Sequence, residues 1–357
     1  MLGNRIHRAR KAAGLNQREL AEQANISAMA ISKYEREINF PSSGVLIALA
    51  KALGVRTEYF FRQIEIELGD VDYREHHKLP AKEEAKVLAD IIEQAERWIE
   101  LEEFIPTAWS VPFELPDKLP QQIKTFDEIE SISTALRQSW NLGLNPIPDL
   151  IDTLESKGVK VFVTRYDEHK NFNGLSTTVN GSPLVVVGKH WPGDRQRFTL
   201  AHELGHLVLK NRLAKKLTSN EEAACNRFAG AFLAPDAMVR GILGEHRTWL
   251  EPQELNILKD EYGLSMGGWI YRAFDLGIIN KQVMQKIWRY FRSKGWKEKE
   301  PGVQYPRERP NLFAQTIYRA LAEDLIGESK AAELLGMSVM DLHACRKMEC
   351  PDAIVDQ

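Results

Sequence analysis

Cysteine is scarce in this sequence, and no stretch is apolar enough over enough residues to suggest a membrane helix. Only 3 of the 357 residues are cysteine, an odd and sparse set that is typical of a reducing compartment and argues against a disulfide framework. We therefore expect Cys345 and Cys350 to be free thiols near the C-terminal end. No apolar run approaches the ~18 residues of a membrane span, and the polar, basic N-terminus lacks the apolar core of a signal peptide. The expectation is a cytoplasmic protein without a membrane partner.

Motifs for several other chemistries are absent as well. No glycine-rich phosphate loop, no Ser/His/Asp order and no RNA-binding motif stands out. The hydrophobic content of 43%, the charged content of 27% and the net charge of −3 are those of ordinary globular domains. A length of 357 residues predicts two to three domains of about 150 residues each.

The most informative stretch covers residues 197–209 and reads R-F-T-L-A-H-E-L-G-H-L-V-L. It contains the H-E-x-x-H pattern at His202, Glu203 and His206. Residues four apart on a helix share a face, so both imidazoles can reach one ion, and Glu203 can reach a water at that ion. The apolar flanks predict a buried helix, where ionisable side chains need a partner or a metal. The pattern predicts a hydrolytic zinc site, and its alternative is two core histidines with satisfied hydrogen bonds.

A third ligand is expected from residues 220–235, which read N-E-E-A-A-C-N-R-F-A-G-A-F-L-A-P. Glu222 lies at helical spacing from Cys225 and from the apolar residues that follow, which places it on the apolar face. Glu221 is a competitor because it lines up with the same face. Cys225 could also ligate zinc, although a small buried side chain is the simpler interpretation.

Together these two segments resemble the ImmA/IrrE-type zinc metallopeptidases, through R-F-T-L-A-H-E-L-G-H followed by E-x-x-[AC]-N-x-F-A-x-x-[FL]-L-x-P. The resemblance runs from about residue 125 to residue 245 and departs from the family at Cys225, where alanine is usual. In that family two histidines and a glutamate bind zinc, and the glutamate of H-E-x-x-H is the general base. The resemblance assigns these roles to His202, His206 and Glu222 as ligands and to Glu203 as base. It also implies a protein substrate, because the family cleaves transcriptional repressors.

Residues 2–61 predict a compact helical unit. Four helices are expected, three of them after a residue that favours an N-cap or helix start: 2–13, 17–24 after Asn16, 28–35 after Ser27, and 44–53 after Pro41 and Ser42. Two helices joined by a short turn, with a small residue (Ala21) at the close contact, form the helix-turn-helix pattern. The unit carries nine Lys/Arg and five acids, a balance of +4 in a chain of net −3, which suits phosphate contact at one end of the molecule.

The stretch G-L-N-Q-R-E-L-A-E-Q-A-N-I-S-A-M-A-I-S-K-Y-E-R closely resembles Xre-family, phage-repressor-like domains, and the resemblance covers nearly all of residues 3–61. It implies that the third helix enters the major groove of double-stranded operator DNA. Gln17 is expected to contact a backbone phosphate. The residues expected to face the bases are Ser27, Ala28, Met29, Ser32 and Lys33. The alternative for this set is an ordinary solvated helix face. Arg10 and Glu35 occupy positions that pair within such domains.

The remaining segments predict helices around a small sheet. A helix from Lys82 to about Phe104 has an apolar stripe that either packs within the chain or forms a homodimer, since helix-turn-helix proteins commonly bind two half-sites. The adjacent His76 and His77 point apart and are expected on the surface. Strands are expected over 159–164 and 184–187, with Asn173-Gly174 and Asn180-Gly181 as turns, and an edge strand could pair with an extended substrate. A short helix-turn-helix shape over 329–345 is expected to stabilise a bundle rather than bind DNA.

The predicted fold class is α+β and mostly helical. The predicted domains are a helix-turn-helix domain (1–61), a helical connector with a proline-rich linker (62–124), a zincin-like α+β peptidase domain with a small sheet (125–245) and a helical extension (246–357). The predicted function is a DNA-binding transcriptional regulator fused to a zinc metalloprotease. Its substrate would be a repressor, a toxin-system partner or the chain itself. The alternative is a repressor or antitoxin whose peptidase fold serves as a sensor or protein-binding surface without proteolysis.

Overall fold

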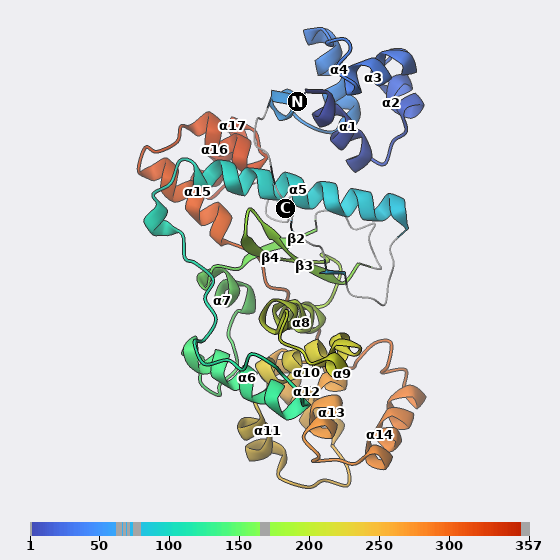
Figure 1. Cartoon of the computed structure of the whole chain (residues 1–357), viewed down its shortest axis with the longest axis vertical. Coiled ribbons are helices and arrows are strands. Elements are labelled where there is room, and N and C mark those ends of the chain that lie inside the picture. The colour runs from blue at the N-terminus through green and yellow to red at the C-terminus, as the bar shows by residue number, and fades with distance from the viewer. Residues whose placement is uncertain are drawn as a thin grey trace.

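The computed structural model describes residues 2–61, 66, 69, 72–73, 80–164 and 172–350, and the predicted surface histidines His76 and His77 lie outside that set. The chain is α+β and mostly helical, as the sequence predicts, with a small sheet near its centre (Figure 1). None of the helices in the described part combines the length and the apolar character that crossing a bilayer requires.

The N-terminal helices form a unit with its own core. They are α1 (Leu2–Ala12), α2 (Gln17–Gln23), α3 (Ala28–Glu35), α4 (Ser43–Leu53) and the 3₁₀ turn η1 (Thr57–Phe61). The side chains of Asn16, Ser27 and Ser42 accept hydrogen bonds from the first turns of α2, α3 and α4, so local capping chemistry sets these helix starts. Ile6, Leu20, Ile31 and Leu49 are fully buried in the core of this unit.

The sheet has the strand order β1-β3-β4-β2. Its strands are β1 (Asp72–Tyr73), β2 (Lys160–Val163), β3 (Gly174–Val179) and β4 (Ser182–Val187); β2 runs parallel to β4, and β3 runs antiparallel to both β4 and β1. Asn180 and Gly181 have φ of 47° and 81° and form the predicted hairpin turn. The second predicted turn is wrong: Asn173 is buried and β3 begins at Gly174, because this glycine allows the strand to approach a helix closely.

Helices cover both faces of the sheet. Successive strand residues point to opposite faces, so each strand contributes side chains to two separate cores. Val161 and Val185 face a core shared with α6 to α14, whereas Phe162 and Val186 face a core shared with α5 and α15 to α17. The first group comprises α6 (Phe126–Ser139), α7 (Leu150–Ser156), α8 (Gly193–Leu209), α9 (Lys215–Thr218), α10 (Glu221–Leu233), α11 (Asp236–Leu243), α12 (Pro252–Tyr262), α13 (Met266–Asp275) and α14 (Lys281–Ser293). The second comprises α5 (Ala81–Glu102), α15 (Leu312–Ala322), α16 (Glu328–Leu335) and α17 (Val339–Arg346).

The long helix α5 packs within the chain, which decides between the two interpretations of its apolar stripe. Val87, Ile91 and Ala95 are buried against the second sheet face and the C-terminal helices. The helix-turn-helix unit rests on its other side through α1 (Figure 1), where the buried Glu96 carboxylate accepts a hydrogen bond from Arg5. The short helices α16 and α17 also join this core, so their role in a bundle is confirmed.

The prediction that Cys345 and Cys350 are free thiols is wrong, because the two form a disulfide. Helix α17 ends at Arg346, and Met348 adopts a positive φ of 63° that turns the chain back on itself. This turn brings the two Cα atoms to 4.2 Å. Among the described residues, Cys225 keeps a free thiol, and it is buried as expected.

Candidate metal centre and DNA-recognition helix

Helix α8 holds the H-E-x-x-H pattern in the interior of the protein. Its apolar side chains, among them Leu200 and Leu204, are buried in the first core, and His202 and Glu203 on the same helix are themselves fully buried. Gly205 allows α10 to lie close, because a Cβ at this position would come within 3.3 Å of the Cys225 Cα atom. The packing of α8 against α10 therefore brings the two predicted ligand segments together.

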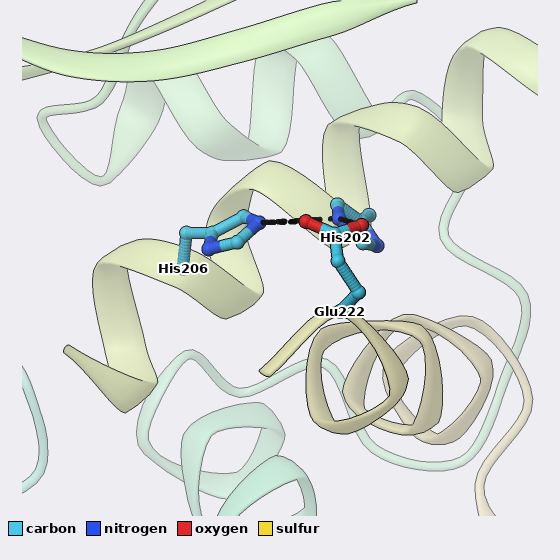
Figure 2. A group of neighbouring side chains, drawn as sticks. All are labelled: His202, His206 and Glu222. Atoms are coloured by element: carbon cyan, nitrogen blue, oxygen red, sulfur yellow. Dashed lines mark hydrogen bonds and ion pairs between the residues drawn. The ribbon is translucent and has the colours of Figure 1, made fainter. Parts of the chain in front are cut away.

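The three predicted ligands meet at one point between these helices, where Glu222 reaches from α10 toward the two imidazoles of α8 (Figure 2). The Nε2 atoms of His202 and His206 lie 3.2 Å apart. The Glu222 carboxylate oxygens lie 3.4 Å from His202 Nε2 and 3.5 Å from His206 Nε2. Ligand atoms bound tetrahedrally to zinc at about 2.0–2.1 Å lie about 3.3–3.4 Å from one another. The two Nε2 atoms and the Glu222 carboxylate, which faces each of them with a different oxygen, thus form a triangle close to the size of one face of a zinc tetrahedron.

A second layer of contacts fixes the orientation of both imidazoles. His202 Nδ1 lies 2.9 Å from Asn226 Oδ1, and His206 Nδ1 lies 3.3 Å from Glu221 Oε1. Both partner atoms accept hydrogen bonds, so each Nδ1 donates, and Nε2 is the nitrogen that faces Glu222 and would offer its lone pair to an ion that displaces the proton. Partners of this kind orient the histidine ligands of metal sites. The role of Asn226 is absent from the sequence analysis, although it stands one helical turn after Glu222.

The charges around the triangle are arranged to receive a cation. Burial raises the pKa of the Glu222 carboxyl, but hydrogen bonds and charges of His202 and His206 outweigh burial and lower that pKa far below its usual range. Burial lowers the pKa of His206, but Cys225 and Glu222 outweigh burial and raise it to about 11. The Glu222 carboxylate is thus ionised, and it lies beside a histidine whose surroundings favour a positive charge. The residues fit a zinc ion in donor type, spacing and charge.

The Glu203 carboxylate lies beside the start of β3. A Cβ atom added to Gly174 would lie 3.4 Å from Glu203 Oε1 and 2.6 Å from the Thr199 Cγ2 atom, so the strand passes over α8 only because this residue is glycine. Glu203 is 0% exposed and adjoins His202 in the chain. A buried carboxylate is therefore held under the start of β3, one residue along α8 from the first predicted ligand, and a base for an attacking water needs such a position.

Cys225 lies close to His206 but is not one of the three triangle residues. Its sulfur shares a second cluster of possible ligand atoms with Glu221 and His206, and it is fully buried in the first core. Burial raises the pKa of its thiol although His206 lowers it, so the neutral thiol is favoured. This position is consistent with a packing role rather than a place among the three triangle atoms.

The predicted DNA-contact residues lie at the start of α2, at the N-cap of α3 and along α3 itself. Ser27 and Met29 are exposed, and Met29 has 68% of its surface accessible. The Ser27 hydroxyl oxygen also accepts a hydrogen bond from the Ala30 amide at 3.1 Å. Ala28, Ser32 and Lys33 are partly exposed on the same helix. The structure thus leaves an accessible α3 surface for a DNA groove.

A buried ion pair holds α1, α2 and α3 together. Arg10 Nη2 donates to Glu35 Oε2 at 2.9 Å, as the sequence predicts, and the Gln17 amide donates to the same oxygen at 2.7 Å. The side chain of Gln17, expected at a phosphate, is therefore oriented by Glu35 at the start of α2.

Comparison with known proteins identifies both parts of the chain. Residues 154–273 match the IrrE N-terminal-like domain of the M78 peptidases, and residues 6–60 match the helix-turn-helix family. A 65-residue stretch is 37% identical to the HTH-type transcriptional regulator ImmR of Bacillus subtilis, covering 18% of this chain and 51% of that protein.

A second relative matches this chain over a stretch of similar length. A 64-residue stretch is 38% identical to an uncharacterised HTH-type transcriptional regulator of Rickettsia conorii, covering 18% of this chain and 51% of that protein. The chain spans about half the length of the curated relatives it matches. From these matches and the geometry above, the chain joins an N-terminal, Xre-like helix-turn-helix DNA-binding domain to an IrrE/ImmA-like domain of the M78 peptidase family.

Proposed function

We propose that this protein is a transcriptional regulator whose M78 domain is a zinc-dependent endopeptidase that cuts a regulatory protein. The observation that carries the proposal is the triangle of His202, His206 and Glu222 donor atoms with Glu203 beside it. A structural cluster would need the two histidines and one acid. It would not need an additional buried carboxylate next to a strand edge, whereas hydrolysis needs one.

The proposed ligands are His202, His206 and Glu222, which leave a fourth position for water or substrate. Zinc held there would acidify a water molecule and polarise the carbonyl of a peptide bond. The chain supplies the proton transfers: Glu203 accepts a proton from the attacking water and delivers it to the departing amine nitrogen. Asn226 and Glu221 keep the imidazoles in the tautomer that ligation needs.

DNA binding belongs to the other end of the molecule. We propose that α3 reads an operator as a homodimer on two half-sites, with Ser27, Ala28, Met29, Ser32 and Lys33 toward the bases and Gln17 toward phosphate. The M78 domain would then act on a protein that governs the same genes, in the cytoplasm where operator and substrate meet.

The test compares newly formed protein N-termini in cells that carry wild type or Glu203→Gln under inducing conditions. Glutamine keeps the shape of the side chain and lacks the base, so we expect at least one N-terminus of a regulatory protein to vanish in the variant while zinc content is unchanged. Identical sets of N-termini would contradict proteolysis and favour the sensor or antitoxin alternative.

A further inference from the structure

The outer edge of β3 is covered by the chain's own residues. β1 pairs antiparallel with β3, with Asp72 opposite Ser176 and Tyr73 opposite Leu175. Upstream of β1, the Gly69 amide donates to the Thr178 carbonyl at 2.9 Å, and the Thr177 hydroxyl donates to the Gly69 carbonyl at 3.2 Å. We call Gly69 together with β1 the edge segment. It comes from the part of the chain between the helix-turn-helix domain and α5.

The strand that carries this edge is also the one that lies against Glu203. β3 starts at Gly174, directly over the Glu203 carboxylate, and runs away from it toward Val179. Because the pairing is antiparallel, the edge segment runs toward the Gly174 end, from Gly69 at Thr178 to Tyr73 at Leu175. An extended peptide that adds to β3 on this side would need the same backbone groups.

From this we infer that the edge segment is an intramolecular pseudosubstrate: it occupies the strand edge of the M78 domain and has to leave before a protein substrate can pair with β3. The effect on proteolysis rests on the proposed function, whereas the pairing of the edge segment with β3 does not. A tethered segment acts at an effective concentration on the order of millimolar, so it competes well against a dilute partner protein.

Gly69 offers a way to displace the segment without touching the metal ligands. A Cβ atom at Gly69 would lie 2.2 Å from the Thr178 Oγ1 atom, so a branched side chain cannot fit against β3 without movement. Gly241 in α11 is a matched control, because a Cβ atom there meets nothing within 4 Å. Thr177→Val is a second variant, which removes the hydroxyl that donates to the Gly69 carbonyl from the β3 side of the contact.

The decisive experiment measures binding of a fluorescein-labelled peptide with the sequence of residues 66–73 to the full chain. All proteins carry zinc and Glu203→Gln, so the peptide is not cut. We expect Gly69→Val to bind it at least about tenfold more tightly than the parent or Gly241→Val. Adding Thr177→Val to Gly69→Val should weaken that binding, because it removes the hydroxyl that would donate to the glycine carbonyl of the peptide. A peptide with valine in place of its glycine should not bind. Equal binding by parent and Gly69→Val, or no binding by Gly69→Val, overturns the inference.

A second arm uses the same glycine variants with Glu203 intact and measures hydrolysis of labelled casein. We expect Gly69→Val to hydrolyse casein severalfold faster than wild type and Gly241→Val to match wild type. Equal rates in all three would overturn the inference. Absence of hydrolysis in every protein would contradict the proposed protease activity instead, and peptide binding would still decide whether the edge segment occupies β3.

Discussion

At the scale of single residues, two neighbouring acids take different places around His206. Glu222 faces the Nε2 atoms of both histidines, while Glu221 faces only Nδ1 of His206. Helical periodicity alone left both acids as candidates, because each lines up with the apolar face of α10. Only the packing of α10 against α8 separates a ligand position from a supporting one.

Glutamine substitution should distinguish the two acids. Loss of a supporting partner typically costs about 10–100-fold in metal affinity, so Glu221→Gln should fall in that range. Glu222→Gln removes a charged ligand and should weaken zinc binding by more than about 100-fold. The measurement is competition with a zinc chelator at fixed pH. A larger loss in Glu221→Gln would show that the ligand is misassigned.

A buried acid away from the centre gives a pH-dependent prediction. Glu155 is 6% exposed, and burial raises its pKa to about 8, opposed by the Leu312 amide that donates to it. The folded-state pKa of Glu155 lies above the ordinary value of 4.5. The stability that Glu155 contributes is therefore complete below pH 4.5 and is lost as pH rises through about 8.

Glu155→Gln removes the charge and should therefore stabilise the fold at pH 8 by on the order of 1–3 kcal/mol, with little effect at pH 5. Thermal unfolding at the two pH values measures the difference. The control is Glu308→Gln, which should destabilise the protein because it deprives the buried Arg197 of its ion pair. Equal shifts of Glu155→Gln at both pH values would contradict the raised pKa.

At the scale of elements, local signals predicted more than distant pairings did. Helix starts in the N-terminal domain follow capping side chains such as Asn16 and Ser27, and these act within one turn of the chain. β1 was not expected, because its partner Ser176 lies about a hundred residues away and two residues carry no periodicity. Asn173-Gly174 looked like a turn for the same reason: the glycine serves a contact with α8 that sequence alone does not reveal.

The recognition element should account for DNA binding. Lys33→Ala combined with Gln17→Ala should weaken binding of the full chain to its upstream promoter region by roughly tenfold or more, and binding should fall as salt rises. Lys51→Ala on α4 removes the same charge outside α2 and α3 and should have little effect. Mobility shifts against the upstream fragment test this. No shift by wild type at low salt would refute the operator and leave α3 as a protein-docking surface.

At the scale of the whole molecule, α5 connects the helix-turn-helix domain to the sheet of the M78 domain. The helix-turn-helix domain rests on one side of α5, while the other side packs on the sheet whose strand β3 overlies Glu203 (Figure 1). A rearrangement of the N-terminal domain could therefore be transmitted to the sheet through direct packing. The sequence placed α5 correctly as an amphipathic helix, but the sides it joins depend on tertiary contacts.

The most direct test of the account is the response of the regulated promoter to its inducing signal in cells that carry wild type or Glu203→Gln. Both proteins should hold zinc and bind the operator equally, because Glu203 is neither a proposed ligand nor part of α3. We predict that wild type relieves repression and that Glu203→Gln does not. An unchanged response in Glu203→Gln would contradict regulation by proteolysis.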